Sequence, residues 1–311
     1  MEKITNEILI DEAMKCGFDL VGFAKAGELT PESVNLKKWL DMKFQAGMTY
    51  MERNLDKREN VKNILPSAKS IISLGVNYYS DEKYLEDTGY GKISRYAWGK
   101  DYHIVIGHSL VRLTEKLKSI DPEFEAKSYV DTGPVMDKAW AVRAGLGWLG
   151  KHTNVISKKF GSWFFIATII CNYEFDYDNT IPDFCGTCTS CISACPTNAI
   201  TDAYVVDSNR CISYLTIENK GAIPDELQGK FENWLFGCDI CQDVCPWNKK
   251  FHKEIKFNEF RSNGNKEIEL SIVENMSEED FDRRFSVSSV KRAKLKGLKR
   301  NAQFLNPTIR K

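Results

Sequence analysis

The stretch "DFCGTCTSCISACPTNAI", from Asp183 to Ile200, places four cysteines and a proline in a short span and decides how the second half of the chain folds. The cysteines are spaced C-x2-C-x2-C-x3-C and a proline follows at once: Cys185, Cys188, Cys191 and Cys195, before Pro196. Bacterial ferredoxins bind 4Fe-4S clusters with this run, in which three thiolates hold one cluster and the fourth holds the other. Structural zinc sites use two cysteine pairs separated by a longer loop. The spacing therefore favours clusters over zinc.

A second stretch, "GCDICQDVCPWN", is one cysteine short of the same run. It supplies Cys238, Cys241 and Cys245, and Cys211 in "RCISYLTIE" is the only nearby thiol left to complete it. Because the fourth cysteine of each run serves the other cluster, the spacing predicts two crossed sets. The first set is Cys185, Cys188, Cys191 and Cys245, and the second set is Cys195, Cys211, Cys238 and Cys241.

The composition suits a protein of a reducing compartment with two folded units. Eight of the ten cysteines lie between Cys185 and Cys245, which favours metal ligands over disulfides. The other two, Cys16 and Cys171, fall on predicted apolar surfaces and are expected to pack as small hydrophobes. The charged N-terminus, "MEKITNEILIDEAMKCG", does not resemble a signal peptide, and no apolar run is long enough to cross a bilayer. We therefore expect a cytoplasmic protein without a membrane segment.

Charge is balanced overall but not along the chain. Lys plus Arg and Asp plus Glu both number 43, so net charge indicates neither nucleic-acid nor membrane binding. After Asp282 no acidic residue follows, whereas ten basic residues do. They are Arg283, Arg284, Lys291, Arg292, Lys294, Lys296, Lys299, Arg300, Arg310 and Lys311. A charge run is usually only a solvated face, and alone it predicts no partner.

Hydrophobic periodicity predicts an α+β fold in three parts. These are an α/β domain over residues 1–180, a ferredoxin-like domain with two 4Fe-4S clusters over 181–250, and a short helical basic tail over 251–311. The expected strands of the first domain are "FDLVGFAKA", "AKSIISLGVNYY", "EAKSYV" and "SWFFIATIICNY". The expected helices are one that Gly17 ends, one that Thr30 caps and Gly47 ends, and one whose buried stripe is Leu110, Leu113, Leu117 and Ile120.

Three stretches of the first domain are candidates for binding a cofactor. In "AGLGWLGKHTN", the residues Gly145, Gly147 and Gly150 spell G-x-G-x-x-G. A dinucleotide site needs a strand before this turn and a helix after it, whereas the sequence predicts a helix before and a strand after. A nicotinamide site is therefore disfavoured, although the glycines leave room for another flat or phosphate-bearing cofactor.

The other two candidates are polar residues at the ends of predicted elements. In "DYHIVIGH", Asp101, His103 and Gly107 approximate the D-x-H-x-x-G cobalamin signature with the glycine one residue late, and we expect Tyr102 and His103 to begin a helix. In "YVDTGPVMDKA", Asp131 follows a short strand. Apolar surroundings there would raise the pKa of its carboxyl enough for proton donation near neutral pH. Capping of the next helix is the other interpretation, and spacing alone favours it.

Taken together, these stretches resemble the epoxyqueuosine reductase family, the cobalamin-dependent iron–sulfur enzymes of the last step of queuosine synthesis in tRNA. The resemblance lies in "SRYAWGKDYH", "VDTGPVMDKAWAVRAGLGWLGKHTN", "FCGTCTSCISACPTNAI", "CISYLTIENKGAIP" and "GCDICQDVCPWN". These stretches occur in the family's order and cover about residues 1–248, with further similarity in "KGLKRNA".

The resemblance implies a cobalamin, held base-off in the first domain close to one cluster, and Asp131 as the catalytic proton donor. It also implies a two-electron, two-proton deoxygenation that turns the epoxide of epoxyqueuosine into an alkene with loss of water. Electrons from an external low-potential donor would pass singly through the clusters to cobalt. The substrate would be tRNA with epoxyqueuosine in its anticodon loop, and we expect a monomer. The residues around the corrin would be Arg58, Arg95, Tyr96, Tyr102, Asp131, Lys151 and His152.

Two departures from the family pattern affect these expectations. Many relatives continue into a C-terminal helical-repeat extension that helps to hold tRNA, whereas this sequence stops at Lys311. The basic tail is therefore expected to contact tRNA phosphates. Some relatives have alanine where Gly133 stands, next to the proton donor, which affects the expected shape of the pocket mouth.

Two other functions compete with this interpretation. A corrinoid reductase of the reductive-dehalogenase type uses the same cofactors, but its respiratory members carry an N-terminal twin-arginine signal, and Arg283-Arg284 lies at the wrong end. A non-enzymatic ferredoxin-like carrier or an iron–sulfur RNA-binding module would leave residues 1–180 without a use. Binding of a corrinoid would discriminate between the enzyme and these modules.

Overall fold

The computed structural model describes residues 3–306. Its N-terminal half is built on a four-stranded antiparallel sheet in the order β1-β2-β7-β4. The strands are β1 (Leu20–Lys25), β2 (Ser70–Asn77), β7 (Phe164–Cys171) and β4 (Ala126–Tyr129). β2 pairs with β7 along its whole length, from Ser70 opposite Cys171 to Asn77 opposite Phe164. All four predicted strands are confirmed.

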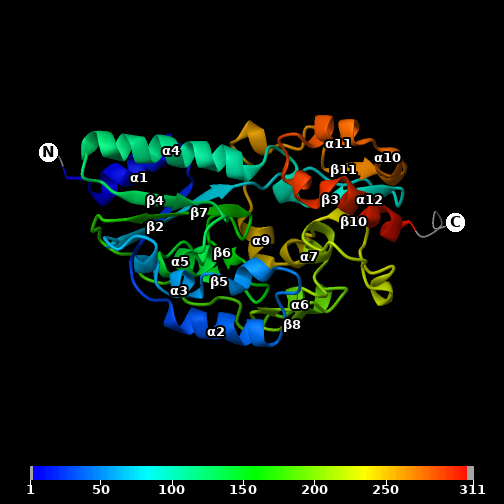
Figure 1. The fold of residues 1–311 in the computed structure, drawn as a ribbon, viewed down its shortest axis with the longest axis horizontal. Coiled ribbons are helices and arrows are strands. Elements are labelled where there is room, and N and C mark those ends of the chain that lie inside the picture. The colour runs from blue at the N-terminus through cyan, green and yellow to red at the C-terminus, as the bar shows by residue number, and fades with distance from the viewer. Residues whose placement is uncertain (1–2, 307–311) are drawn as a thin grey trace.

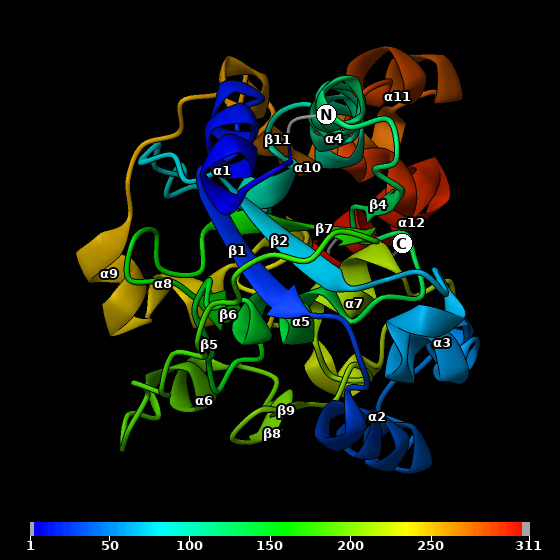
Figure 2. The same cartoon turned by 90° about the vertical axis from the view of Figure 1, so that its left-hand side faces the viewer.

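Helices cover both faces of this sheet, as Figure 1 and Figure 2 show. α1 and α4 lie on one face, whereas α5 lies on the other, with α2 and α3 beyond it. The helices are α1 (Asn6–Lys15), α2 (Thr30–Asp41), α3 (Leu55–Glu59), α4 (Tyr102–Ile120) and α5 (Asp137–Arg143). In β2, Ile72 and Leu74 pack in the core under α1 and α4, and Ile71 packs in the core around α5. Because helices cover both faces, nearly every residue of β2 and β7 is buried, including the polar Ser70, Ser73 and Asn77 of β2.

The prediction for the second helix is wrong at both ends. α2 ends at Asp41 rather than at Gly47, because Lys43 takes a left-handed φ of 58°, which a right-handed helix cannot continue. The N-cap residue is Leu29 rather than Thr30, and it makes no capping bond with its side chain. The prediction for α4 is confirmed. It begins at Tyr102 and buries the expected leucine stripe, with the fourth stripe position, the last residue of α4, only partly buried.

The cysteine-rich segment folds into short elements joined by turns, as the sequence predicts. Short strand pairs precede and follow its first run: β5 (Trp148–Leu149) with β6 (Val155–Ile156), and β8 (Ile200–Asp202) with β9 (Val205–Val206). The helical turns are α6 (Ser190–Ala194), α7 (Ile212–Ile217), η4 (Asp225–Leu227), α8 (Ile240–Asp243) and α9 (Pro246–Phe251). α6 and α8 pack on each other, which brings the two cysteine runs together.

The C-terminal region is a packed layer rather than a projecting tail. Its elements are η5 (Asn258–Phe260), β11 (Glu267–Glu269), α10 (Leu270–Asn275), α11 (Glu278–Phe285), η6 (Ser289–Ala293) and α12 (Lys294–Leu305). β3 (Tyr90–Ile93) lies between β10 (Trp234–Phe236) and β11 in a second sheet. Each of the three predicted segments therefore supplies one strand of this sheet. The division at residues 180 and 250 stays a prediction about folding units.

A core of apolar side chains lies around this second sheet. Trp98 and Phe236 are fully buried in it, together with Phe285 and Leu298 from the C-terminal helices. This core explains why the basic C-terminal region folds at all: α12 buries an apolar stripe and leaves its lysines outside. Within residues 3–306, no helix combines the length and the apolar character needed to cross a membrane.

Candidate functional site

The first cysteine set surrounds one cavity of about 290 Å³. Cys185, Cys188, Cys191 and Cys245 all line it, together with Trp247. Three of these thiols come from the loop and first turn of α6, and Cys245 is the N-cap residue of α9. In the part of the chain that the structure describes, no three His, Cys, Asp or Glu side chains converge on a position for one ion, as a tetrahedral zinc site requires. The thiols face a larger space.

The second cysteine set lies around α7 and α8. Burial raises the pKa of Cys241 far above its ordinary value, and the negative charges of Cys211 and Cys195 raise it further. The pKa of Cys238 is raised in the same way, by burial first and then by Cys241. Thiols that oppose one another's ionisation need a cation, and metal coordination deprotonates a thiol outright. The donor set therefore fits a metal cluster.

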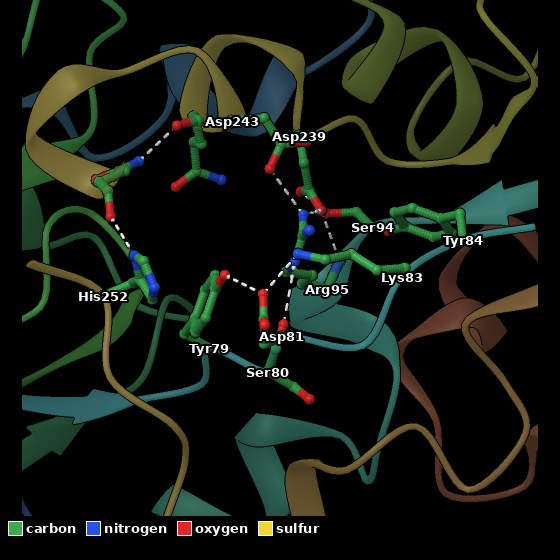
Figure 3. Close-up of polar contacts among 12 residues, drawn as sticks. Tyr79, Ser80, Asp81, Lys83, Tyr84, Ser94, Arg95, Asp239, Asp243 and His252 are labelled. Atoms are coloured by element: carbon green, nitrogen blue, oxygen red, sulfur yellow. Dashed lines mark hydrogen bonds and ion pairs between the residues drawn. The ribbon is translucent and has the colours of Figure 1, made fainter. Parts of the chain in front are cut away.

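Ion pairs of Arg95 connect the segment that carries Cys238 and Cys241 with the N-terminal half of the chain (Figure 3). Its backbone N–H donates to Asp239 Oδ2 at 2.9 Å, and its guanidinium donates to Asp239 at 3.2 Å and to Asp243 at 2.9 Å. The Ser94 hydroxyl donates to the other oxygen of Asp239. The side chain of Arg95 is 8% exposed and that of Asp239 is fully buried. Removing either partner would leave an uncompensated buried charge, which is strongly destabilising.

Four aromatic rings surround the Arg95 guanidinium at 5.1–5.7 Å: Tyr79, Tyr84, Trp98 and Trp163. Rings at this distance stabilise a cation that is shielded from water. Arg95 was predicted to contact the corrin. That role stays a prediction, but the donors of Arg95 are already committed to the acidic residues of α8 and its flank.

Asp131 lies two residues after the end of β4 in a left-handed backbone conformation. Its φ is 55°, a region that Asp enters more readily than most residues with a Cβ. The Tyr102 hydroxyl donates to Asp131 Oδ2 at 2.9 Å, and the Tyr102 ring stacks on Phe165 with centroids 4.4 Å apart. Asp131 does not cap α5, whose N-cap residue is Met136. The capping interpretation is therefore wrong, and the exposed carboxylate of Asp131 is available for chemistry.

Asp137, which the sequence reasoning missed, is a second carboxyl near Asp131. Burial raises the pKa of Asp137 to about 7, and the negative charge of Asp131 adds to this shift. The Thr168 hydroxyl donates to its carboxylate and Arg58 acts on it electrostatically, both of which oppose the shift. Arg58 is itself buried and donates to the carbonyl oxygen of Tyr50 at 3.3 Å. The signal that was available is the second aspartate in "VDTGPVMDKA".

Lys138 connects Asp131 with the second cysteine set. Its Nζ donates to the carbonyl oxygen of Thr153 at 3.0 Å and to Asn154 Oδ1 at 2.9 Å. Burial lowers the pKa of Lys138, whereas the negative charges of Asp131, Cys241 and Cys211 oppose that shift. The exposed carboxylate and the second cysteine set therefore share one electrostatic environment.

Lys151 and His152, predicted as corrin contacts, both line the cavity of the first cysteine set, and their contact with the corrin stays a prediction. Lys151 Nζ donates to the carbonyl oxygens of Gly186 at 2.6 Å and Cys188 at 2.9 Å. His152 lines the cavity and is 4% exposed, and burial lowers its pKa to about 4. His152 Nδ1 accepts from the backbone N–H of Asn154 at 3.1 Å, so the proton of the neutral ring is on Nε2. Within residues 3–306, this buried Nε2–H has no acceptor, so a cluster sulfur in the cavity would fit it.

The G-x-G-x-x-G stretch serves chain packing. α5 precedes it, β5 lies within it and β6 follows it, the reverse of the dinucleotide order, as the sequence predicts. A Cβ at Gly147 would lie 2.1 Å from the carbonyl oxygen of Ile156, and Gly145 takes a φ of 69°. Both glycines are therefore required by the chain's own backbone.

Family comparisons cover both halves of the site. A model described as "4Fe-4S double cluster binding domain" matches residues 184–248, and one described as "Epoxyqueuosine reductase QueG, DUF1730" matches residues 58–132. The chain is 46% identical over 306 residues to the epoxyqueuosine reductase of Cellulophaga algicola, covering 96% of this chain and 97% of the relative. It is 47% identical over 293 residues to that of Leadbetterella byssophila, covering 94% and 95%.

Solved structures agree with these relatives. The chain is similar to a crystal structure of epoxyqueuosine reductase with an epoxyqueuosine-modified tRNA-Tyr stem loop, with a TM-score of 0.91, 34% identity, and 96% of this chain and 80% of that one covered. It is also similar to epoxyqueuosine reductase from Bacillus subtilis, described with its catalytic aspartate loop swung out of the active site (TM-score 0.89, 32% identity, 96% and 80% covered).

An α/β sheet domain joined to a segment that holds two 4Fe-4S clusters defines an iron–sulfur oxidoreductase. Sequence identity of 46–47% over nearly the whole length of two epoxyqueuosine reductases identifies the family within this class. The chain belongs to the epoxyqueuosine reductase family.

Proposed function

We propose that this protein reduces epoxyqueuosine to queuosine in tRNA, with electrons passing through two 4Fe-4S clusters to a cobalamin beside Asp131. The observation that carries this proposal is the position of Asp131, whose carboxylate is exposed and shares an electrostatic environment with the second cysteine set through Lys138. The structure of a relative with an epoxyqueuosine-modified tRNA stem loop supports the same substrate for this chain.

The crossed assignment of ligands is part of this proposal. Cys185, Cys188, Cys191 and Cys245 line one cavity. Cys195, Cys211, Cys238 and Cys241 are grouped by the mutual effects on their pKa values. Both groupings support one cluster in each set. Cys191 also raises the pKa of Cys241, so the two clusters would be close enough to exchange electrons.

The residues around Asp131 fit a cofactor that combines a flat ring with a phosphate. Arg58 and Lys138 supply positive charge, and Tyr96 and Tyr102 supply aromatic surface. Cobalamin, when bound, supplies a cobalt centre that accepts electrons singly and cleaves the carbon–oxygen bond. We propose that the residues holding it include Arg58, Tyr96 and Tyr102.

Asp131 supplies the proton in this proposal. The net reaction consumes two electrons and two protons and gives an alkene and water. Tyr102 donates to Asp131 Oδ2, which leaves Oδ1 as the oxygen that carries and delivers the proton to the departing epoxide oxygen. Tyr102 thus orients the carboxyl and keeps its own proton, since burial and the charge of Asp131 raise the pKa of Tyr102 far above its ordinary value.

The proposed tRNA contact narrows to a few of the basic C-terminal residues. Arg292 pairs with Glu218, and Arg300 donates to backbone carbonyl oxygens, so both have structural roles. Lys294 and Lys296 are exposed and have no ion pair in the range 3–306. These lysines would contact phosphates without reading bases, which gives salt-sensitive affinity. Two of the predicted basic residues, Arg310 and Lys311, lie outside the described residues.

The test is mass spectrometry of nucleosides from epoxyqueuosine-bearing tRNA. The tRNA is incubated anaerobically with cluster-reconstituted protein and reductant, with and without cobalamin. We expect queuosine to form only with cobalamin. If no queuosine forms although both clusters and the corrinoid are demonstrably bound, the tRNA substrate is wrong.

A further inference from the structure

The cavity of the first cysteine set lies close to the surface of the molecule. It is bordered by exposed residues, Pro246 and Lys250. Two of the thiols that line it, Cys185 and Cys188, are themselves partly exposed. An electron carrier at the surface can therefore come close to this set.

A chain of aromatic rings leads from this cavity to the surface. Trp247 lines the cavity and stacks on Phe251, with centroids 5.5 Å apart and an interplanar angle of 10°. The Trp247 ring also lies 5.7 Å from that of Phe184, and its indole N–H donates to the carbonyl oxygen of Phe184 at 3.1 Å. Phe184 is 38% exposed although it is a large apolar side chain. Exposed apolar surface next to a cofactor is typical of an interaction site.

Unpaired lysines surround these rings. Lys158 Nζ lies 4.0 Å from the centre of the Phe184 ring, and Lys250 Nζ lies 5.2 Å from that of Phe251. Lys249 is exposed on α9 and acts electrostatically on Cys245. In the described range 3–306, none of these three ammonium groups has an ion pair. The rings of Phe184, Trp247 and Phe251 and the lysines Lys158, Lys249 and Lys250 form what we term the aromatic–lysine face.

Two acidic residues, Asp183 and Glu254, lie near the aromatic–lysine face along the chain. The charge of Glu254 is offset by Arg261, 3.8 Å away. Asp183 keeps its negative charge, since its partners are the neutral Tyr204 hydroxyl and the backbone N–H of Cys185. The three lysines outnumber it, so the face presents net positive charge around an apolar centre. A partner that fits it carries negative charge around its own redox centre, since complementary potentials steer association.

We propose that the aromatic–lysine face docks a small acidic one-electron carrier protein, which reduces the cluster of the first cysteine set. The proposal rests on the proposed function, because it requires that set to hold a 4Fe-4S cluster. The step transfers one electron from the reduced carrier to the oxidised cluster, with no bond made and no proton moved. An RNA would also be attracted to lysines, but the rings of this face lead to the first cysteine set, whereas Asp131 lies by the second.

The experiment is anaerobic stopped-flow reduction of the cluster-loaded protein by reduced plant-type 2Fe-2S ferredoxin, an acidic carrier, followed by the loss of cluster absorbance. The variant is Lys158→Glu/Lys249→Glu, which leaves the cavity-lining Lys250 unchanged. We expect its second-order rate constant to fall at least about 10-fold at low salt, because steering raises on-rates by about 10–1000-fold. Raising the salt concentration should remove most of that difference.

Two controls separate docking from other effects. Lys116→Glu/Lys118→Glu makes the same charge change on exposed positions of α4, far along the chain from the cysteines, and should reduce at the wild-type rate. Dithionite should reduce both variants like the wild type. A Lys158→Glu/Lys249→Glu rate equal to that of the wild type, or an equal fall in the α4 variant, would overturn the proposal. Loss of tRNA binding with an unchanged ferredoxin rate would make the face an RNA surface instead.

This readout is independent of the substrate. If epoxyqueuosine is not converted with any reductant, the rate of cluster reduction still tests the docking of the carrier. Failure of the proposed function and failure of this inference are therefore distinguishable.

Discussion

The first cysteine set lies under a surface of aromatic rings and lysines, whereas the second lies between Arg95 and Asp131. The two cysteine runs are almost the same in spacing, so cysteine chemistry alone does not separate the two sets. Their surroundings do. One set offers a route from solvent, and the other offers proximity to a carboxylate that can deliver a proton. In the proposed function, electrons pass from the first set, the open end, to the second set, the enclosed end beside Asp131.

Replacing Asp131 by asparagine is expected to have the largest effect and tests the chemistry assigned to the enclosed end. Without a carboxyl to deliver the proton, turnover should fall by about 10²–10⁴-fold, the usual contribution of general acid catalysis. Queuosine formation measures turnover, and the iron content and cluster spectra should stay at wild-type values. Turnover within a few-fold of wild type would remove Asp131 from the mechanism.

Replacing Arg95 by methionine tests how the enclosed set is held. Breaking a buried ion pair by removing one partner costs about 3–5 kcal/mol, so the variant should unfold at much lower denaturant concentration and lose the second cluster first. Lys37→Met is the matched control, because the Lys37–Glu59 pair is largely exposed, at 52% and 33%. Exposed pairs contribute about 0–1 kcal/mol. If the two variants lost the same free energy of unfolding, Arg95 would not be what stabilises the second cysteine set.

The double variant Arg95→Met/Asp239→Asn sharpens this test. It removes both charges of the buried pair, so it should recover part of the stability that the single variant loses. A double variant less stable than the sum of the single ones would contradict a direct interaction of the two side chains.

The pH dependence of stability tests whether the surroundings of Asp137 exclude water. Burial raises its pKa from 3.8 to about 7 in the folded protein, so folding takes up a proton. This contribution to stability is fully present below the unfolded pKa of 3.8 and is lost as the pH rises through about 7. The melting temperature of the wild type should therefore fall relative to Asp137→Asn between about pH 5 and pH 8, by roughly 2–4 °C per kcal/mol. Parallel curves for the two proteins would contradict a buried carboxyl.

Replacing His152 tests the first cysteine set alone, at the open end, and should have the smallest effect of these changes. Its Nε2–H would stabilise the reduced, more negative cluster, so His152→Phe should lower the midpoint potential of one cluster by tens of millivolts. For a one-electron couple, about 59 mV corresponds to a tenfold change in the equilibrium constant, or about 1.4 kcal/mol. Redox titration followed by electron paramagnetic resonance measures both clusters, and only one should move. His152→Gln keeps a donor and should restore most of the shift. A shift of both clusters would contradict the assignment to the first set.

Local patterns predicted much of this molecule. β7 is an almost continuous apolar run and β2 is buried along its whole length, as expected of strands covered on both faces. β4 is short and partly exposed, and its position in the sequence rather than its burial made it recognisable. The cysteine spacing led to two sets, and the spacing of glycines after a helix excluded a dinucleotide site. The end of α2 was not predictable in this way, because Lys43 takes a left-handed conformation that side-chain patterns do not encode.

The parts of the site that were missed depend on distant contacts. Arg95 pairs with Asp239, which lies more than a hundred residues away, so local sequence does not predict this pair. Asp137 acquires its raised pKa from the burial provided by the folded sheet and helices. Lys151 and His152 follow β5 and line the cavity of the first cysteine set, a position that local patterns did not predict, and their contact with the corrin stays a prediction. Each of these positions is set by tertiary structure rather than by its sequence neighbours.

The second sheet has a consequence for synthesis on the ribosome. β3 emerges early, but its partners β10 and β11 are encoded far downstream, β11 at residues 267–269. At translation rates of about 5–20 residues per second, β3 waits roughly 10–35 seconds for β11. During that interval one edge of β3 is unpaired, which is a hazard for aggregation. Chaperone demand during translation should therefore concentrate on nascent chains that contain β3 and lack β11, and ribosome profiling of chaperone-bound chains would detect it there.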